Sequence, residues 1–495
     1  MSGRSDSSLA ALGLRARGGR EARITGLALD SREVRPGFLF AAFPGTRVHG
    51  GEFIQYALRQ EAAAILTDPT GARIAADALA GADVALIVTE DPRAAFAGAA
   101  ALWFAAQPAT MSAVTGTNGK TSVAHFTRQI WTLLGHEAAS IGTTGVEGAY
   151  AAPLAHTTPD SLTLHRVLAE MTQAGVTHAV MEASSHGLAQ ARLDGVVLTA
   201  AGFTNFSQDH LDYHADFEEY FAAKAGLFDR VLPDDGTAVL NLDDAKGPVL
   251  AGIARSRGQE VLGIGTGAEA DLRITGQRFD ATGQELRLEW AGRPRQVRLN
   301  LIGGFQAENV AVAAGLAIAC GDEADHVLDT LPDLHGVHGR MELAARRENG
   351  AVVFVDYAHT PDALSTALKA LRPHVMGRIV VVFGAGGDRD RTKRPLMGEA
   401  AAAHADVVYV TDDNPRSEDP AAIRAEVMRG CPEAIEIGDR AEAILRGVDA
   451  LQPGDALLVA GKGHETGQIV GDAVYPFDDV EQASVAVAAL DGRVR

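Results

Sequence analysis

The feature that most constrains the fold is a repeated alternation of unbroken apolar segments with segments of helical periodicity. From about residue 109 the apolar segments read ATMSAVTG, VTHAVMEAS, VVLTAAGFTN and TAVLNLDD. Strands without a polar face are typical of a parallel sheet that is covered on both sides. Before the second segment, apolar residues recur at helical spacing and predict one buried helix face: Leu164, Val167, Leu168 and Met171. The sequence therefore predicts an α/β protein with a central, mostly parallel sheet.

The pattern changes twice along the chain, and three domains are predicted. At 495 residues the chain exceeds what one hydrophobic core usually organises. Residues 1–108 carry short strands between Gly/Pro turns and are interpreted as a small α/β recognition module. Residues 109–337 hold the central sheet, with alternating strands at 271–300 that predict an antiparallel appendage. After GVHGRME a second alternation of strands and helices begins, so 338–495 is predicted to be a Rossmann-like domain.

Charge and composition exclude several classes of protein. The formal net charge of −20 argues against a surface that binds nucleic acid or an anionic membrane. The longest apolar run, residues 94–106, is too short to span a bilayer and is expected to be a buried helix. The first residues lack the apolar stretch of a signal peptide, and Cys320 and Cys431 have no metal-ligand spacing. We expect a monomeric cytoplasmic protein that binds neither nucleic acid nor membrane.

A glycine-rich turn, GTNGKTS at 116–122, joins the first central strand to the next helical segment. Glycines let backbone N–H groups close around a phosphate, the helix N-terminus adds partial positive charge, and a lysine reaches the outer phosphates. Val114 stands where the full Walker pattern has a glycine, so a shorter phosphate loop remains. The alternative is an ordinary turn with a solvated lysine. We predict that ATP binds this loop, with Lys120 catalytic and Thr121 on Mg²⁺, through Gly116, Thr117, Asn118, Gly119, Lys120, Thr121 and Ser122.

Acidic and histidine side chains follow two further strands, at the edge where ligands collect in a parallel sheet. Glu182 ends the strand in MEASSHG, and FTNFSQDHLDYH at 203–214 is too polar for a core segment. A lone histidine in such a place is more often structural, but the acids and histidines gathered here favour a metal site. Lys224 lies on an amphipathic helix, where a lysine that extends to solvent is the alternative to a functional one.

These segments resemble the Mur ligases of peptidoglycan synthesis, and among them the members that add the third residue of the stem peptide. The resemblance rests on the GTNGKT loop, MEASSHGL, FTNFSQDHLDYH and the lysine after EEYFAA. It continues through GGFQAEN, HGRME, VDYAHTP and GAGGDRDRTKRP, and so covers nearly the whole chain. Two residues depart from the family pattern: Gln306 stands where asparagine is usual, and His338 stands where proline is usual.

The resemblance implies two Mg²⁺ ions, a nucleotide site and a site for a UDP-linked substrate. Glu182, His210 and Lys224 would hold the second ion, with Lys224 carbamylated so that an amine becomes an anionic ligand; Lys224 and His210 would then be catalytic. The ATP site would extend to Asn309, Arg340, Asp356 and His359. The UDP-linked substrate would contact Leu29, Ser31, the loop Thr46-Arg47-Val48, His156, Thr157, Thr158, Ser184, Gln190 and Arg192.

The segment DNPR at 413–416 follows a predicted strand and indicates which amino acid is added. An arginine fork binds a carboxylate through two parallel hydrogen bonds, and a neutral group cannot replace it. Meso-diaminopimelate differs from lysine by one distal carboxylate, so Arg416 would distinguish the two. The alternative is a solvated turn with an idle arginine. By resemblance, the diaminopimelate site would comprise Arg389, Asp413, Asn414, Pro415, Arg416, Gly461 and Glu465, with Glu465 suited to the distal ammonium group.

The resemblance implies an ATP-dependent, ADP-forming ligation in which meso-diaminopimelate is added to UDP-N-acetylmuramoyl-L-alanyl-D-glutamate through an acyl phosphate. A folate polyglutamate synthetase is the alternative within enzymes, but DNPR, MEASSHGL and the N-terminal module oppose it. A regulatory protein that senses ATP is the alternative outside enzymes. Clustered acids and a second, carboxylate-binding loop would serve no purpose in such a sensor.

Overall fold

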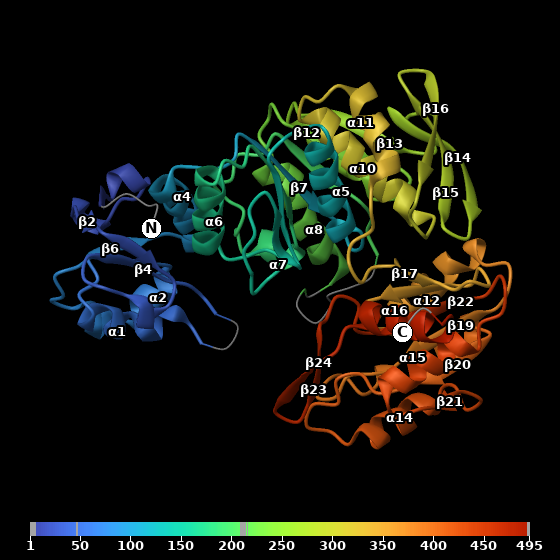
Figure 1. The fold of residues 1–495 in the computed structure, drawn as a ribbon. Coiled ribbons are helices and arrows are strands. Elements are labelled where there is room, and N and C mark those ends of the chain that lie inside the picture. The colour runs from blue at the N-terminus through green and yellow to red at the C-terminus, as the bar shows by residue number, and fades with distance from the viewer. Residues whose placement is uncertain (1–5, 46–47, 208–213, 215, 493–495) are drawn as a thin grey trace. The chain divides into compact units, whose positions relative to one another are not determined.

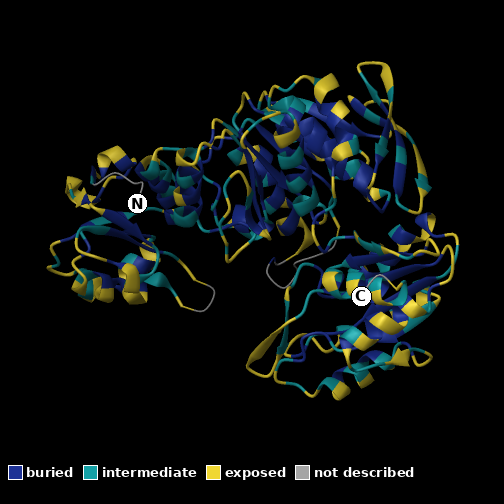
Figure 2. Ribbon diagram, viewed as in Figure 1, coloured by how far each residue is buried: buried dark blue, intermediate teal, exposed yellow. Residues whose placement is uncertain are grey.

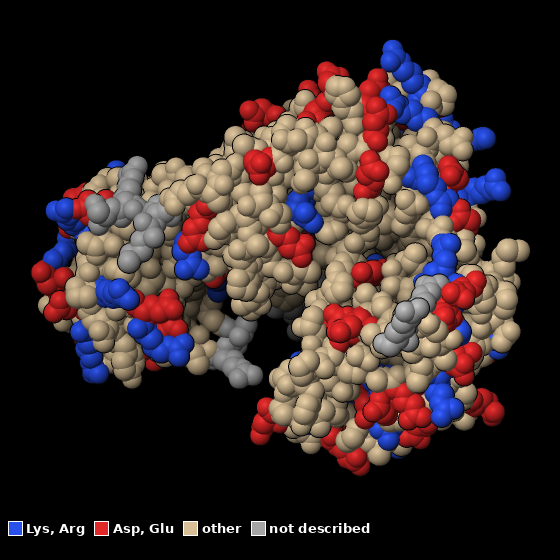
Figure 3. Space-filling model, viewed as in Figure 1, with Lys and Arg blue, Asp and Glu red and all other residues tan. Residues whose placement is uncertain are grey.

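The computed structural model describes residues 6–45, 48–207, 214 and 216–492 (Figure 1). Figure 2 shows that the strands are largely buried and that exposed residues gather on loops and outer helix faces. Acidic and basic side chains both occur across the face of the molecule that Figure 3 shows. Among the described residues, no helix combines the length and the apolar character that are needed to cross a membrane.

The chain forms two compact units. Unit 1 comprises residues up to Arg273 together with Asn309–Thr330, and unit 2 comprises Ile274–Glu308 together with the residues from Leu331 onwards. The three predicted domains, 1–108, 109–337 and 338–495, divide the chain differently, and their boundaries stay a prediction.

Unit 1 begins with a small parallel sheet. Its strands lie in the order β3 (Gly26–Ala28), β4 (Phe38–Ala42), β5 (Ala64–Thr67) and β6 (Ala85–Val88). The run at 94–106 lies mostly within helix α4 (Pro92–Phe104), where Phe96 and Trp103 are buried, so the predicted buried helix is confirmed. The remaining elements here are β1 (Ser7–Ser8), β2 (Arg23–Ile24), α1 (Ile54–Arg59), α2 (Pro69–Ile74) and α3 (Ala76–Leu79).

The central sheet of unit 1 confirms the predicted parallel arrangement. Its hydrogen-bonded order is β13 (Glu260–Gly265), β12 (Thr237–Asn241), β11 (Ala200–Phe203), β7 (Thr110–Thr115), β10 (His178–Glu182), β8 (Ala138–Gly142) and β9 (Gly145–Gly148). Only the pair of β8 and β9 is antiparallel among these neighbours. The helices are α5 (Lys120–Leu133), α6 (Ser161–Gln173), α7 (Ser185–Ala189), α8 (Phe217–Gly226), α9 (Gly247–Ser256), α10 (Phe305–Ala319) and α11 (Ala324–Thr330). The predicted apolar stripe of α6 is buried in the core.

The strands after β13 correspond to the alternating segments that were predicted at residues 271–300. The pair β15 (Gly283–Trp290) and β16 (Arg293–Leu299) is antiparallel, as predicted. However, β14 (Leu272–Asp280) begins parallel to β13, which it pairs through Leu272 and Arg273. This parallel pair joins β14 to a strand outside residues 271–300, so it does not contradict the predicted antiparallel appendage.

Unit 2 is built around a six-stranded sheet that confirms the Rossmann-like prediction. Its order is β17 (Glu342–Arg346), β18 (Val352–Asp356), β22 (Ala456–Ala460), β19 (Ile379–Phe383), β20 (Val407–Val410) and β21 (Ile435–Glu436), with only β17 antiparallel to its neighbour. The helices are α12 (Pro361–Leu371), α13 (Lys393–His404), α14 (Pro420–Met428), α15 (Arg440–Asp449) and α16 (Asp479–Leu490), and a hairpin consists of β23 (Gly467–Val470) and β24 (Ala473–Pro476).

Alternate residues of the inner strands of this sheet enter two different cores. Phe354 of β18 packs in the core that contains Leu364 of α12, whereas its neighbour Val355 packs in the core that contains Ile444 of α15. Successive side chains of a strand point to opposite faces, so both faces are apolar and both are covered by helices. This is the physical reason why the unbroken apolar segments of the sequence became buried parallel strands.

Candidate functional site

The phosphate loop lies between the end of β7 and the first residue of α5, as predicted. Gly116 has φ of 150° and Gly119 has φ of 87°. A Cβ atom at Gly116 would lie 1.9 Å from Thr204 Oγ1, and one at Gly119 would lie 2.4 Å from Asn309 Oδ1. Both positions therefore require glycine. The close approach to Gly119 also brings Asn309, a predicted nucleotide-binding residue, to the loop.

Two lysines converge on one carbonyl oxygen of this loop. Lys120 Nζ donates to the carbonyl oxygens of Gly116 and Thr117 at 2.9 and 2.8 Å, and Lys224 Nζ donates to Gly116 O at 2.7 Å. Lys224 is only 1% exposed, and its Nζ lies 4.6 Å from the centre of the Tyr220 ring. Lys224 is therefore not a lysine that extends to solvent; it lies buried at the phosphate loop.

The segment after β11 fixes the shape of the phosphate loop. The N–H of Thr117 donates to Asn205 O at 2.8 Å, and the N–H of Asn118 donates to Asn205 Oδ1 at 3.0 Å. Thr204 Oγ1 donates to Asn118 O at 2.6 Å, and Thr117 Oγ1 lies 3.2 Å from the hydroxyl of Tyr220 on α8. These neutral hydrogen bonds hold the loop from outside, so its conformation does not depend on the lysines alone.

Glu182 ends β10 with its carboxylate at the first turn of α5. The side chain is buried, Oε2 accepts from Thr121 Oγ1 at 3.0 Å, and Oε1 accepts from the N–H of Thr143 at 2.8 Å. A Cβ atom at Gly142 would lie 2.0 Å from Oε1, so the glycine makes room for this carboxylate. A hydroxyl and a carboxylate in contact beside a phosphate loop are ligand types that suit Mg²⁺. Two predicted metal ligands, Thr121 and Glu182, are thus brought together.

Four predicted substrate residues form a hydrogen-bonded cluster next to Glu182. Thr158 Oγ1 donates to Glu182 O at 2.9 Å and accepts from the N–H of Ser184 at 3.0 Å. Arg192 Nη1 donates to Thr158 O at 2.6 Å, and Arg192 Nη2 donates to Gln190 Oε1 at 2.8 Å. Through Thr158 the cluster reaches the backbone of Glu182, whose side chain faces the phosphate loop. The cluster therefore adjoins the predicted reaction site.

The other described substrate residues are less closely connected. Thr157 Oγ1 lies 3.0 Å from Thr143 Oγ1, and His156 is exposed. Leu29 directly follows β3, and Ser31 is the first residue of the short 3₁₀ helix Ser31–Glu33. Leu29 and Ser31 therefore belong to the small N-terminal sheet and not to the cluster around Thr158.

Three predicted site residues, Thr46, Arg47 and His210, lie outside the described residues. Within residues 6–45, 48–207, 214 and 216–492, no group of three or more His, Cys, Asp and Glu side chains is arranged to hold a metal ion. His214 is described and buried, with its ring centre 5.3 Å from that of Tyr220 and 5.7 Å from that of His186. Of the polar segment after β11, the described residue His214 therefore lies beside α7 and α8.

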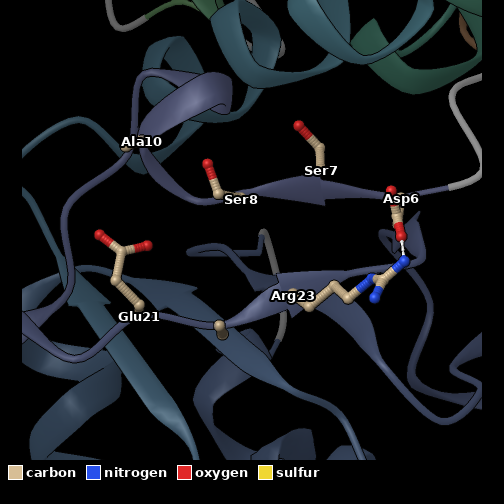
Figure 4. A pocket seen from close by; sticks show the side chains of 7 residues that line it. Asp6, Ser7, Ser8, Ala10, Glu21 and Arg23 are labelled. Atoms are coloured by element: carbon tan, nitrogen blue, oxygen red, sulfur yellow. Dashed lines mark ion pairs between the residues drawn. The ribbon is translucent and has the colours of Figure 1, made fainter.

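A hollow of about 630 Å³ opens beside β1 and β2 (Figure 4). Asp6 and Arg23, which line it, form an ion pair. The other lining residues are Ser7, Ser8, Ala10, Glu21 and Ala22. No described residue of the predicted sites lines this hollow, so it is not a candidate for the predicted substrate site.

Three predicted nucleotide residues lie around Tyr357 in unit 2. The guanidinium carbon of Arg340 lies 4.5 Å from the centre of the Tyr357 ring, and the His359 ring centre also lies 4.5 Å from it. Asp356 ends β18 and accepts from the N–H of Met341 at 2.7 Å. Burial raises the pKa of Asp356, against the opposing effect of Arg340, and burial lowers the pKa of His359. Both shifts disfavour the charged form of the side chain.

The DNPR segment lies after β20, and its arginine has an uncommon backbone conformation. Arg416 has φ of 51°, in the left-handed region that residues with side chains rarely adopt. Its N–H donates to Ile469 O at 3.0 Å, and its Nη1 donates to Gly387 O at 2.8 Å. Asn414 is buried, and its Nδ2 donates to Glu465 Oε2 at 2.8 Å. Two predicted diaminopimelate residues, Asn414 and Glu465, are therefore in direct contact.

The remaining diaminopimelate residues approach one another through glycines. A Cβ atom at Gly386 would lie 2.9 Å from Arg416 Nη1 and 3.8 Å from Arg389 Cγ, so both arginines lie close to Gly386. A Cβ atom at Gly461, which has φ of 116°, would lie 2.7 Å from Asp413 Oδ2. Pro415 contacts the same loop, because a Cβ atom at Gly387 would lie 1.9 Å from Pro415 O. The structure thus brings these predicted residues to the carboxyl ends of β19, β20 and β22.

Sequence analysis missed one buried cation at this place, Lys462. The residue is 0% exposed, and its Nζ donates to Asn414 Oδ1 at 3.3 Å and to Glu465 Oε2 at 3.2 Å. Lysine is almost never fully buried unless it is paired. Its place inside GKGHE, directly after a glycine at the end of an apolar strand, was the available signal.

Comparison with known proteins shows which family shares these features. Three family descriptions match successive parts of the chain. The Mur ligase family catalytic domain matches residues 23–103, the Mur ligase middle domain matches 114–317, and the Mur ligase glutamate ligase domain matches 339–463.

Individual proteins match over almost the whole chain. The chain is 50% identical over 475 residues to UDP-N-acetylmuramoyl-L-alanyl-D-glutamate–2,6-diaminopimelate ligase of Caulobacter vibrioides, covering 94% of this chain and 96% of that protein. It is 51% identical over 470 residues to the protein of the same name from Bradyrhizobium diazoefficiens, covering 94% and 95%. A solved structure of a ligase of that name is 35% identical, with a TM-score of 0.72 and coverage of 94% and 95%. MurF ligase from Thermotoga maritima in complex with ADP, 19% identical with a TM-score of 0.58 and coverage of 98% and 99%, shares the fold.

Proposed function

The chain belongs to the Mur ligase family, and we propose that it joins meso-diaminopimelate to UDP-N-acetylmuramoyl-L-alanyl-D-glutamate while ATP is converted to ADP and phosphate. One observation supports this choice within the family: Arg416 and Arg389 both lie close to Gly386. The Arg416 guanidinium and the aliphatic part of the Arg389 side chain thus meet at one glycine. Arginines at one site suit an amino acid that carries a second carboxylate, because an analogue without that carboxylate leaves their charge unpaired.

The proposed chemistry turns a poor leaving group into a good one. A free carboxylate acylates an amine poorly, because oxide would have to leave. A carboxylate oxygen of the D-glutamate side chain attacks the γ-phosphorus of ATP, ADP leaves, and an acyl phosphate forms. The amine of diaminopimelate then attacks the acyl carbon, phosphate leaves, and the nitrogen loses a proton. Lys120 supports the first step, because its ammonium group at the phosphate loop reduces the repulsion between two anions.

We propose that Thr121 and Glu182 hold Mg²⁺. Their side-chain oxygens lie 3.0 Å apart beside the phosphate loop, and the N–H of Thr143 holds the second carboxylate oxygen in place. Oxygen ligands of this kind suit Mg²⁺, and the bound ion would neutralise charge on the transferring phosphoryl group.

A second ion is proposed at Glu182, His210 and carbamylated Lys224. The support is electrostatic: the ammonium groups of Lys120 and Lys224 share the carbonyl oxygen of Gly116 and repel each other where Lys224 is buried. A carbamate forms from the neutral form of a lysine amine. Reaction of that amine with carbon dioxide forms a carbamate and releases a proton. The exchange of a positive charge for a negative one would turn repulsion from Lys120 into attraction.

The substrates are assigned to the sites on the same basis. We propose that the cluster of Thr158, Ser184, Gln190 and Arg192 binds the UDP-linked substrate, because Thr158 of this cluster contacts the backbone of the metal-binding residue Glu182. His156 and Thr157 are assigned to the same substrate. The uracil end is assigned to Leu29, Ser31 and Thr46 of the N-terminal module. The nucleotide is assigned to Gly116, Thr117, Asn118, Gly119, Lys120, Thr121, Ser122, Asn309, Arg340, Asp356 and His359.

The incoming amino acid is assigned to the DNPR loop and its neighbours. Arg389 and Arg416 would bind the distal carboxylate, and Glu465 would bind the distal ammonium group. Glu465 already accepts from Lys462 and Asn414, so its carboxylate is held in one orientation. The remaining members are Asp413, Asn414, Pro415 and Gly461.

The reaction would serve peptidoglycan precursor synthesis in the cytoplasm, with the protein as a monomer. We propose that uridine recognition, ATP binding and amino-acid binding divide among residues 1–108, 109–337 and 338–495. The test is phosphate release from ATP by purified protein with Mg²⁺. Release that requires both the UDP-dipeptide and diaminopimelate supports the proposal, whereas release with folate and glutamate in their place would contradict it.

A further inference from the structure

We propose that Arg394 is a positioning residue for diaminopimelate recognition: through Glu418 it fixes the DNPR loop against the loop that carries Arg389. The proposal rests on the proposed function, because it concerns the same amino-acid site. Arg394 lies at the start of α13, and the side-chain hydrogen bonds that it donates go to Glu418, Glu426 and Gly386, none of which is assigned to that site.

Arg394 forms a fully buried fork. The residue is 0% exposed, with Nη2 donating to Glu418 Oε1 at 2.8 Å and Nη1 donating to Glu418 Oε2 at 3.0 Å. Nη1 also donates to Glu426 Oε2 at 2.8 Å, and Nη2 donates to Gly386 O at 3.2 Å. One planar cation therefore connects α14, the DNPR loop and the loop after β19. A lysine offers a single point charge and cannot reproduce this geometry.

The two loops also bind each other directly beside their arginines. Glu418 Oε1 accepts from the N–H of Asp388 at 2.6 Å. The Asp388 carboxylate in turn accepts from Ser417 Oγ at 2.6 Å and from the N–H of Ser417 at 3.2 Å. Asp388 directly precedes Arg389, and Ser417 directly follows Arg416. The link thus holds each loop at the residue next to its carboxylate-binding side chain.

Backbone conformation explains why such a link is needed. Asp388 has φ of 53° and Arg416 has φ of 51°, both in the left-handed region. Residues with side chains keep such conformations only where their surroundings enforce them. Loss of the link would let both residues return to negative φ, and the chain direction at Arg389 and Arg416 would change. The Arg394 guanidinium also holds the pKa of Glu418 at about 2, so that Glu418 stays ionised at neutral pH.

The variants Arg394→Lys and Glu418→Gln test the proposal. Arg347→Lys is the matched control, because Arg347 Nε donates to Asp491 Oδ1 at 3.0 Å and the pair is mostly buried elsewhere in unit 2. Steady-state kinetics are measured for diaminopimelate and ATP, alongside thermal unfolding. We expect the KM for diaminopimelate to rise about tenfold in both test variants, with kcat and the KM for ATP changed less than twofold. The control should keep all three kinetic constants.

The outcomes separate the inference from the proposed function. An unchanged KM for diaminopimelate in a folded test variant would overturn the inference, and so would a parallel rise in the KM for ATP, which a general loss of structure would produce. Wild-type protein that does not use diaminopimelate at all would instead refute the proposed function. Glu418 is partly exposed, so Glu418→Gln decides the question if Arg394→Lys does not fold.

Discussion

Replacement of Arg416 by glycine separates the backbone role of this residue from its side-chain role. The left-handed φ of 51° costs a residue with a side chain about 1 kcal/mol or more, and it costs glycine nothing. The backbone hydrogen bonds of residue 416, to Ile469 O at 3.0 Å and from the N–H of Gly471 at 2.7 Å, need no side chain. Arg416→Gly should therefore keep the fold and unfold at the same or a higher temperature than the wild type.

The loss in binding can be worked from the guanidinium fork. Each hydrogen bond to a charged group contributes about 1.5–3 kcal/mol. Arg416 Nη1 already donates to Gly387 O, and Arg389 remains in the variant, so only part of the two-bond contribution is lost. A loss of roughly 3 kcal/mol corresponds to a decrease of about 150-fold in kcat/KM for diaminopimelate. Lysine has no distal carboxylate, so kcat/KM for lysine should change less than twofold.

The assay follows ADP release with diaminopimelate or lysine as the acceptor. Ala291→Gly is the control, because Ala291 has φ of 49° in the turn between β15 and β16 and belongs to no predicted site. It should raise stability slightly and leave kinetics unchanged. A folded Arg416→Gly variant that keeps the wild-type kcat/KM for diaminopimelate would refute the assignment of the fork.

Three further predictions concern the reaction centre and the stability of unit 1. Lys120→Ala should lower kcat at least a hundredfold without a change in the unfolding temperature; near-normal turnover in this variant would count against charge neutralisation at the loop. Carbon-13 NMR with labelled bicarbonate should show a carbamate signal that is absent from Lys224→Ala; an identical spectrum for both proteins would exclude the modification. Glu147 has its pKa lowered to about 2, with the neighbouring His125 side chain as the largest cause, so its contribution to stability is complete above pH ~4.5 and disappears as the pH falls towards 2. Urea unfolding between pH 5 and 3 should therefore show a shallower loss of stability for Glu147→Gln than for the wild type, and equal slopes would contradict the assigned pKa.

Much of the fold could be predicted because buried strands and buried helix faces have a recognisable pattern of apolar residues in the sequence. Unbroken apolar segments marked the strands that are covered on both faces, and the periodicity of Leu164 to Met171 marked the buried side of α6. No sequence pattern indicated the direction in which β14 pairs with β13. Only Leu272 and Arg273 pair with β13, and alternating polarity is the same for a parallel and an antiparallel neighbour.

The candidate site could be predicted only in part, because charge in the sequence does not reveal burial. The glycines before Lys120 indicated the phosphate loop. Glycine is needed there because Gly116 packs against Thr204 and Gly119 packs against Asn309, which leaves no room for a side chain at either position. Arg394 could not be recognised, because arginine is normally exposed and its partner Glu418 lies 24 positions further along the chain. For Lys462 the available signal was its place directly after a glycine at the end of an apolar strand. The left-handed φ of Arg416 was also hidden, because it is imposed by neighbouring loops and not by the local sequence.

The central claim is that this protein transfers the energy of ATP to an amide bond with diaminopimelate, selected by its distal carboxylate. Mass spectrometry of the product tests it most directly, with the UDP-dipeptide, ATP and Mg²⁺ supplied together with equal amounts of diaminopimelate and lysine. The account predicts one UDP-tripeptide that contains diaminopimelate, formed with an equal amount of ADP. A lysine product in comparable amount, or ATP that stays intact, would contradict it.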